Sequence, residues 1–168
     1  RFDVRGKVSV GRDVEIDVMK NFAEHGVNVK RWTVREHVGT HIDAPLHFSA
    51  DGISCDLIPA DELVVPLVII DIAARAEVQA SCAVTPDDIA AFEKKNGPIP
   101  EGCCVAMHSG WARHVRTPKY RNADARGKMH FPGFHVECAH ALLERKVTGL
   151  GVDTMSIDQG PTETFATH

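Results

Sequence analysis

The sequence has no apolar run long enough to cross a membrane. The longest apolar segment, residues 63–70, is interrupted by Pro66, whereas a membrane-spanning helix needs roughly 20 apolar residues. Positive charge is also scarce, because 19 Lys and Arg against 23 Asp and Glu give a net charge of −4. An acidic chain is a poor match for a polyanion. We therefore expect neither a membrane nor a nucleic acid as partner.

The cysteines do not form a metal-binding pattern. There are five, and no two have CxxC spacing, so a thiolate zinc site is not predicted. Adjacent Cys103 and Cys104 lie in an apolar run, where they resemble small buried hydrophobic residues. Thiols without a disulfide pattern are typical of a reducing compartment, and the cytoplasm is the simplest setting. Histidine is what the chain has in excess, with ten residues.

The apolar pattern predicts an α/β fold in one domain over residues 1–168. Thr85 is a candidate N-cap with Pro86 at the first helical position. The segment 63–72 is apolar on both faces, so we expect it at the centre of the sheet. A sheet that is at least partly parallel follows from the order of the elements. Strands are predicted over 28–36, 63–72, 103–107 and 147–153, and helices over 85–95 and 135–146.

Three histidines and an aspartate gather in the segment 36–48, which reads EHVGTHIDAPLHF. Imidazole and carboxylate are ligands that Zn²⁺ and Mn²⁺ accept, and a catalytic site uses about three of them with one position open. His37, His41 and Asp43 supply such a set. The alternative is a polar strand end with incidental histidines. We favour the metal site because these residue types rarely coincide around a flexible glycine.

The backbone of this segment must bend for the ligands to meet. Gly39, Pro45 and several β-branched residues disfavour a helix. A straight strand would separate His37 from His41 by roughly 13 Å, too far for two ligands of one ion. We therefore predict a turn at residues 38–40, permitted by Gly39, with His41 and Asp43 pointing the same way.

His47 is the candidate proton carrier. An imidazole with an ordinary pKa near ~6.5 can take a proton from a metal-bound water whose pKa is lowered to about 7. Two other roles stay open for His47: a fourth metal ligand, or a structural hydrogen-bonding group beside Pro45.

The pattern His-x-Gly-Thr-His-x-Asp-Ala-Pro-x-His-Phe at 37–48 resembles the signature of the cyclase family, which includes bacterial kynurenine formamidases and isatin hydrolases. A second segment, GLGVDTMSID at 149–158, resembles a later strand and loop of that family. The resemblance extends from about Val29 to the end of the sequence. It implies a swivelling β/β/α fold with a mixed, partly parallel central sheet, and a homodimer or higher homo-oligomer.

The resemblance also implies roles for particular residues. His37, His41 and Asp43 would bind one or two divalent ions, Zn²⁺ or Mn²⁺, and His47 would act as acid and base. His168 falls where the family has a further metal-ligating histidine. The Glu or Gln that usually follows is not in this sequence, which implies a domain truncated at its C-terminus.

Two aromatic residues are candidates for substrate contact. Trp111, in the segment MHSGW after a predicted strand, would form an aromatic wall, or would pack on the core as part of an ordinary strand exit. Phe134, in the segment FPGFH, would close over the site, or would tuck inward ahead of a helix. The acids Asp153 and Asp158 would orient metal ligands from behind, or Asp158 would cap the turn before Gly160.

The run between 111 and 131 mixes basic and aromatic residues. Such a run is compatible with an RNA-binding stripe, but a solvated loop is the more common outcome and fits the acidic total better.

The function expected from these features is metal-dependent hydrolysis of an amide-type C–N bond in a small aromatic substrate, such as an N-formyl arylamine or a cyclic amide like isatin. A lactone hydrolase or dehydratase on the same metal site is the alternative among enzymes. A catalytically inactive metal-binding module is the alternative outside them.

Overall fold

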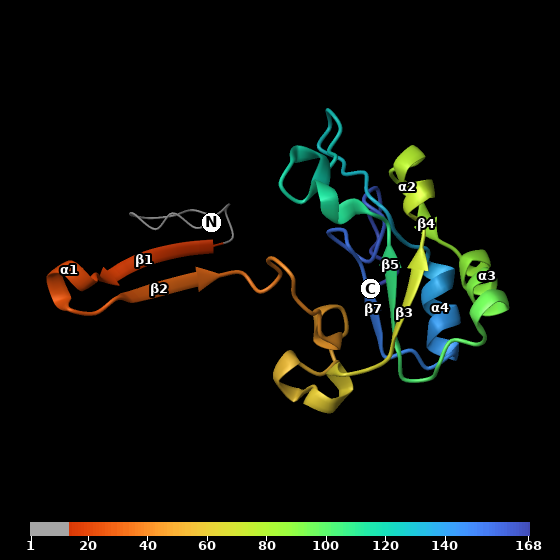
Figure 1. Ribbon diagram of the computed structural model, residues 1–168, viewed down its shortest axis with the longest axis horizontal. Helices are drawn as coiled ribbons and strands as arrows, with labels where there is room; N and C mark the ends of the chain where they lie inside the picture. The colour runs from red at the N-terminus through yellow and green to blue at the C-terminus, as the bar shows by residue number, and fades with distance from the viewer. Residues whose placement is uncertain (1–13) are drawn as a thin grey trace. The chain divides into compact units, whose positions relative to one another are not determined.

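The computed structural model describes residues 14–168, and its chain divides into two compact units, Arg1–Ile58 and Pro59–His168 (Figure 1). We call them the N-terminal unit and the C-terminal unit. The α/β class predicted from the sequence is confirmed. Antiparallel and parallel pairing both occur, in separate sheets.

The described part of the N-terminal unit is built on an antiparallel hairpin. Strand β1 (Val14–Lys20) pairs with β2 (Val29–Val34), which confirms the strand expected over 28–36. The short helix α1 (Phe22–His25) connects them. The Asn21 side chain accepts a hydrogen bond from the Glu24 N–H at 3.0 Å, and Gly26 closes the helix in the left-handed region with φ 68°. Two 3-10 helices follow, η1 (Pro45–His47) and η2 (Cys55–Leu57).

A three-stranded parallel sheet forms the centre of the C-terminal unit. Its order is β3-β5-β7, made by β3 (Leu67–Asp71), β5 (Cys104–His108) and β7 (Gly149–Gly151). The helices α3 (Pro86–Asn96) and α4 (Val136–Glu144) pack side by side against one face (Figure 1). Between sheet and helices lies the core, which includes Val68, Ile70, Val84, Ile89, Val105, Met107, Phe134, Cys138 and Leu142.

Strand β3 corrects one expectation. The apolar segment 63–72 was expected at the centre of the sheet, but within the described residues β3 lies at an edge and β5 takes the centre. Val68 and Ile70 are buried, whereas Leu67 and Ile69 on the other face are 61% and 52% exposed. Continuous apolar sequence therefore does not show how many neighbours a strand has, because pairing depends on distant segments.

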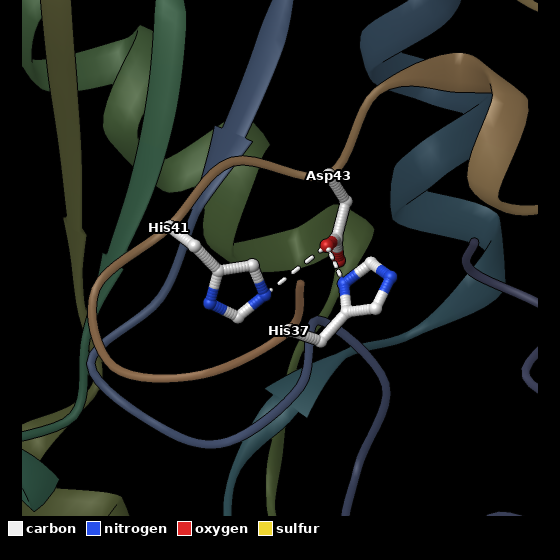
Figure 2. Close-up of side chains that lie close together, drawn as sticks. All are labelled: His37, His41 and Asp43. Atoms are coloured by element: carbon white, nitrogen blue, oxygen red, sulfur yellow. Dashed lines mark hydrogen bonds and ion pairs between the residues drawn. The ribbon is translucent and has the colours of Figure 1, made fainter. Parts of the chain in front are cut away.

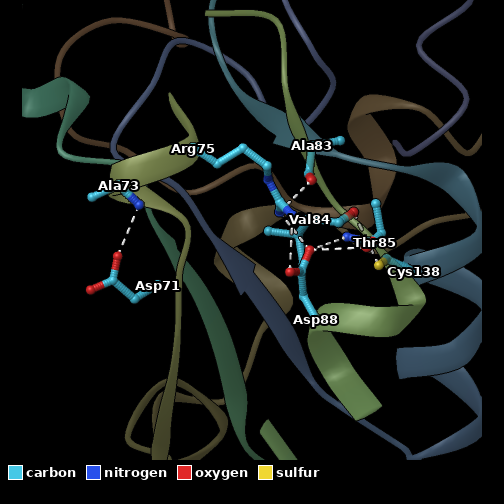
Figure 3. Close-up of polar contacts among 8 residues, drawn as sticks. All are labelled: Asp71, Ala73, Arg75, Ala83, Val84, Thr85, Asp88 and Cys138. Carbon is cyan, nitrogen blue, oxygen red and sulfur yellow. Dashed lines mark hydrogen bonds and ion pairs between the residues drawn. The ribbon is translucent and has the colours of Figure 1, made fainter. Parts of the chain in front are cut away.

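Helix α3 begins as its sequence indicates. The carboxylate of Asp88 accepts hydrogen bonds from the Thr85 N–H at 2.8 Å and the Thr85 hydroxyl at 3.0 Å. Arg75, on helix α2 (Ala73–Val78), also binds Asp88 through both terminal nitrogens, at 3.1 and 2.6 Å (Figure 3). The start of α3 is thus fixed to α2 by an ion pair as well as by its own cap.

Two shorter features complete the C-terminal unit. Strands β4 (Ala83–Val84) and β6 (Gly133–Phe134) form a separate parallel pair. The 3-10 helices η3 (Ala60–Leu63), η4 (Trp111–His114) and η5 (Pro118–Tyr120) lie in the connecting segments. In residues 14–168 no helix combines the length and apolar character of a membrane span.

Candidate metal centre

The predicted bend lies at Gly39. Its φ of 70° is in the left-handed region, which a residue with a side chain seldom adopts. The backbone bends at residues 36, 37, 39 and 40, and the Val38 N–H donates to the Glu36 carbonyl at 3.1 Å. The backbone bends locally after β2 at the position predicted for the turn, residues 38–40. As a result, His37 and His41 lie on the two sides of one loop.

Three potential ligand atoms converge inside this loop. The Asp43 Oδ1 atom lies 2.6 Å from His37 Nδ1 and 3.1 Å from His41 Nε2 (Figure 2). The ligand atoms of the three residues all lie within 4.8 Å of one another. The two imidazole rings meet edge to face, with centroids 5.3 Å apart. The structure therefore brings together the three residues that the spacing singled out.

The orientation of His41 is set by its own backbone loop. Its Nδ1 lies 2.9 Å from the Gly39 carbonyl oxygen, and because a carbonyl only accepts, Nδ1 carries the proton. In a neutral ring the lone pair is then on Nε2, the nitrogen near Asp43 and the one that could bind an ion. Gly39 thus has two roles, supplying the bend and the hydrogen-bond acceptor. The second role leaves no signal in the sequence, because any residue has a carbonyl.

The donor set fits a divalent ion. Two imidazoles and a carboxylate suit Zn²⁺ or Mn²⁺, and three protein ligands are the usual number in a catalytic zinc site. Each of the three side chains is about one-third exposed (34%, 31% and 34% for His37, His41 and Asp43). Within the N-terminal unit a ligand could therefore approach the cluster. A hollow of about 540 Å³ beside His37 is lined by Val34, Arg35 and Glu36.

His47 is held beside the cluster by η1. Pro45 occupies the start of this 3-10 turn, and the His47 N–H donates to the Ala44 carbonyl at 2.9 Å. The His47 ring then stacks on the His37 ring, with centroids 3.8 Å apart and planes tilted by 32°. The loop that returns from η1 is closed tightly at Gly52, where an added Cβ would lie 2.4 Å from the Pro45 carbonyl carbon.

His168, the fourth predicted ligand, lies in the C-terminal unit. Its Nδ1 contacts Asp158 Oδ2, and the two side chains are 9% and 4% exposed. Its role in metal binding stays a prediction. Its ring is held by a buried carboxylate, an arrangement that often accompanies ligating histidines.

Trp111 and Phe134 are both buried in the C-terminal unit, at 2% and 1% exposed. The Trp111 indole N–H donates to the Tyr120 carbonyl at 2.9 Å, while Phe134 belongs to the core. This packing matches the inward alternative for each residue, and their contact with substrate stays a prediction. Trp111 is also anchored through its backbone N–H to Asp153 Oδ2 at 2.8 Å.

Asp153 fixes the segment that follows β5. Its Oδ1 accepts from both the N–H and the hydroxyl of Ser109, the hydroxyl at 2.5 Å. With the bond to Trp111, this carboxylate therefore ties the segment after β7 to the segment after β5. In the sequence Asp153 and Ser109 are 44 residues apart, so local patterns give no sign of the contact.

Comparisons with known proteins agree with this geometry. The model of the Cyclase family ("Putative cyclase") matches residues 8–159. The chain is 31% identical to the isatin hydrolase of Roseibium aggregatum, over 74% of this chain and 49% of that protein. It is 29% identical to the kynurenine formamidase of Salinibacter ruber, over 83% of this chain and 57% of that protein. The chain thus spans about half the length of the curated relatives it matches.

Solved structures give the same result. An isatin hydrolase bound to the product analogue thioisatinate superposes with a TM-score of 0.83 at 28% identity, covering 92% of this chain and 63% of that one. A protein from Bacillus stearothermophilus described as a predicted metal-dependent hydrolase superposes with a TM-score of 0.65 at 25% identity, covering 92% of this chain and 64% of that one. The His/Asp cluster, the fold and the match over residues 8–159 together show that this chain belongs to the cyclase family.

Proposed function

We propose that the protein is a metal-dependent hydrolase that cleaves an amide-type C–N bond of a small aromatic substrate, either an N-formyl arylamine or a cyclic amide such as isatin. One observation carries the proposal. The ligand atoms of His37, His41 and Asp43 converge within 4.8 Å, and the ring of His47 is stacked on this cluster. Metal ligands beside an acid–base group are what metal-assisted hydrolysis of an amide uses.

The ion would be held by His37, His41 and Asp43, with His168 as a further ligand. When bound, a divalent ion polarises a carbonyl and lowers the pKa of a water molecule. The protein's own contribution is orientation: the Gly39 carbonyl holds the His41 ring at 2.9 Å, and the turn at Gly39 brings both rings to Asp43.

His47 would move the proton. Nucleophilic water has to lose a proton and the departing nitrogen has to gain one, and a single imidazole can carry it between them. Its ring lies 3.8 Å from the ring of His37, centroid to centroid. The Phe48 ring lies edge-on at 4.6 Å from it, so an apolar side chain covers part of the His47 ring.

The substrate class rests on the relatives. One relative is named as an isatin hydrolase and one as a kynurenine formamidase, and both names denote cleavage of a C–N bond next to an aromatic ring. A cytoplasmic homodimer or higher homo-oligomer is the proposed setting.

The experiment measures metal content and turnover together. Purified chain is assayed with Zn²⁺ or Mn²⁺ on isatin, N-formylkynurenine and an aromatic lactone. We expect one or two ions per chain and turnover of an amide. In His41→Ala the turnover rate should be lower by at least about 100-fold. His25→Ala is the matched control, because His25 ends the exposed helix α1 of the same unit and should keep both activity and metal.

Three outcomes would contradict the proposal. Protein that neither binds Zn²⁺ or Mn²⁺ nor changes its activity when they are added contradicts the metal site. Turnover of the lactone but of neither amide would identify the reaction as ester hydrolysis. Metal binding without turnover of any of the three compounds indicates a binding module instead of an enzyme.

A further inference from the structure

We infer that Asp158 is a positioning residue that fixes the tautomer of His168, so that Nε2 is the nitrogen able to bind the metal ion. The inference rests on the proposed function, because it takes His168 as a ligand of that ion. It adds a residue outside the predicted ligand set, and it assigns a specific atom of His168 to the metal.

The carboxylate of Asp158 is buried, and both of its oxygens are engaged. Its side chain is 4% exposed. Oδ1 accepts the Thr167 N–H at 3.0 Å, and Oδ2 contacts His168 Nδ1. One oxygen would be enough to tie the turn at 158–167, so the turn alone does not account for the contact of the second oxygen with the imidazole.

The chemistry of the pair determines which nitrogen carries the proton. An ionised carboxylate can only accept, so Nδ1 of His168 must be the donor. A neutral imidazole has one N–H, which leaves the lone pair on Nε2. His41 is arranged the same way, with Nδ1 donating to the Gly39 carbonyl at 2.9 Å. Both histidines would therefore bind through Nε2, and in His168 the acceptor behind the ring carries a negative charge, which makes the ring a stronger ligand.

The backbone holds Asp158 where the contact requires it. Residue 158 forms a parallel bridge with Phe134, and the Phe134 N–H donates to the Ile157 carbonyl at 2.7 Å. At Gly133 an added Cβ would lie 2.4 Å from the Asp158 carbonyl carbon. The two segments thus pack backbone against backbone, which fixes the Cα position from which the Asp158 carboxylate reaches His168.

His168 is also fixed from its other sides. Its backbone N–H donates to the Phe165 carbonyl at 3.2 Å. The Phe165 ring lies edge-on to the His168 ring, with centroids 6.0 Å apart. The neighbouring Thr167 hydroxyl donates to the Phe134 carbonyl at 3.2 Å. A ring that is held this way loses little conformational entropy when it binds an ion, so fixing its position in advance favours binding.

The test variant is Asp158→Asn. The amide oxygen can still accept from the Thr167 N–H, but the NH₂ group then faces His168 Nδ1 and requires it to be an acceptor. The proton moves to Nε2, and the lone pair for the metal is lost. Thr167→Val is the matched control, since it removes only the 3.2 Å hydrogen bond to Phe134 and leaves the Asp158–His168 pair intact.

Two measurements follow on wild type, Asp158→Asn, Thr167→Val and His168→Ala. Chelator competition gives the Zn²⁺ affinity, and ¹⁵N NMR of the metal-free protein gives the tautomer of His168. We expect Asp158→Asn to lower the affinity by about 10- to 100-fold and to move the proton from Nδ1 to Nε2. Adding Asp158→Asn to His168→Ala should lower the affinity no further, because the ring through which Asp158 acts is gone.

The outcomes separate this inference from the proposed function. Wild-type protein that fails to bind Zn²⁺ overturns both. If His168→Ala lowers the Zn²⁺ affinity but Asp158→Asn keeps the wild-type affinity, the role of Asp158 is overturned and the proposed function is not. An Nε2–H tautomer in the wild-type protein overturns it as well, whatever the metal data show. If Thr167→Val loses as much affinity as Asp158→Asn, the effect is one of general packing, and the inference is wrong.

Discussion

The imidazole rings of His37 and His47 are stacked, with centroids 3.8 Å apart and planes tilted by 32°. The Nδ1 atom of His37 faces Asp43, whereas His47 belongs to η1. The predicted ligand and the predicted proton carrier are therefore neighbours, although ten residues of sequence separate them. This arrangement allows their two roles to be tested separately.

The first prediction concerns His47. Replacing it with Gln keeps a polar side chain of similar reach but removes the imidazole that would carry the proton. We expect His47→Gln to bind Zn²⁺ with nearly wild-type affinity while its kcat falls by about 10²- to 10⁴-fold. Chelator competition and steady-state kinetics on isatin measure the two quantities. A drop in Zn²⁺ affinity as large as that of His41→Ala would identify His47 as a fourth ligand instead.

The second prediction concerns Gly39. Its φ of 70° is strained for any residue with a side chain, although no described heavy atom lies within 4 Å of an added Cβ. Gly39→Ala should therefore cost about 1–2 kcal/mol of stability through backbone strain. Relief of that strain moves the carbonyl that holds His41 at 2.9 Å, so the Zn²⁺ affinity should fall by about 10-fold or more.

Gly26→Ala is the control for this variant. Gly26 has a φ of 68° and an equally open Cβ position among the described residues, but it ends α1. We expect a similar loss of stability by thermal unfolding with no change in Zn²⁺ affinity. Equal affinities for the two variants would show that the Gly39 carbonyl does not orient His41.

The third prediction concerns the pH dependence of stability at Asp88. Burial acts to raise the pKa of this carboxyl, but hydrogen bonds from Arg75 and Thr85 outweigh it and hold the pKa below its usual value of 3.8. The Asp88 contacts therefore stabilise the folded state fully above the unfolded pKa, and this contribution is lost as the pH falls through the lower folded pKa. The carboxylate is 21% exposed and Arg75 is 37% exposed, which moderates the effect.

Asp88→Asn should lower the free energy of unfolding by about 1–2 kcal/mol at neutral pH. The difference from wild type should begin to shrink below about pH 4, near the unfolded pKa, and should be lost only below the lower folded pKa, where the wild-type carboxylate is protonated too. Denaturant unfolding at a series of pH values measures it. Asp87→Asn removes the same charge from the first turn of α3 at an exposed position, so it should cost less. A loss for Asp88→Asn that is independent of pH contradicts the prediction.

Local sequence determined the parts of this protein that depend on neighbouring residues. The start of α3 at Thr85 and Pro86 follows from the chemistry of helix caps. His37, His41 and Asp43 lie within seven consecutive residues that include a glycine. A single bend of the backbone is therefore enough to bring the three side chains together. The family signature lies in the same segment.

Tertiary structure decided the contacts between distant segments. The edge position of β3, the Asp153 contact with Ser109 across 44 residues and the pairing of Arg75 with Asp88 all require segments that meet only in the folded chain. The tautomer of His168 is the most consequential of these, since it depends on a carboxylate held in place by β6. Sequence patterns report propensity and periodicity, whereas the hydrogen bonds that orient a ring depend on which chain segments become neighbours when the core is buried.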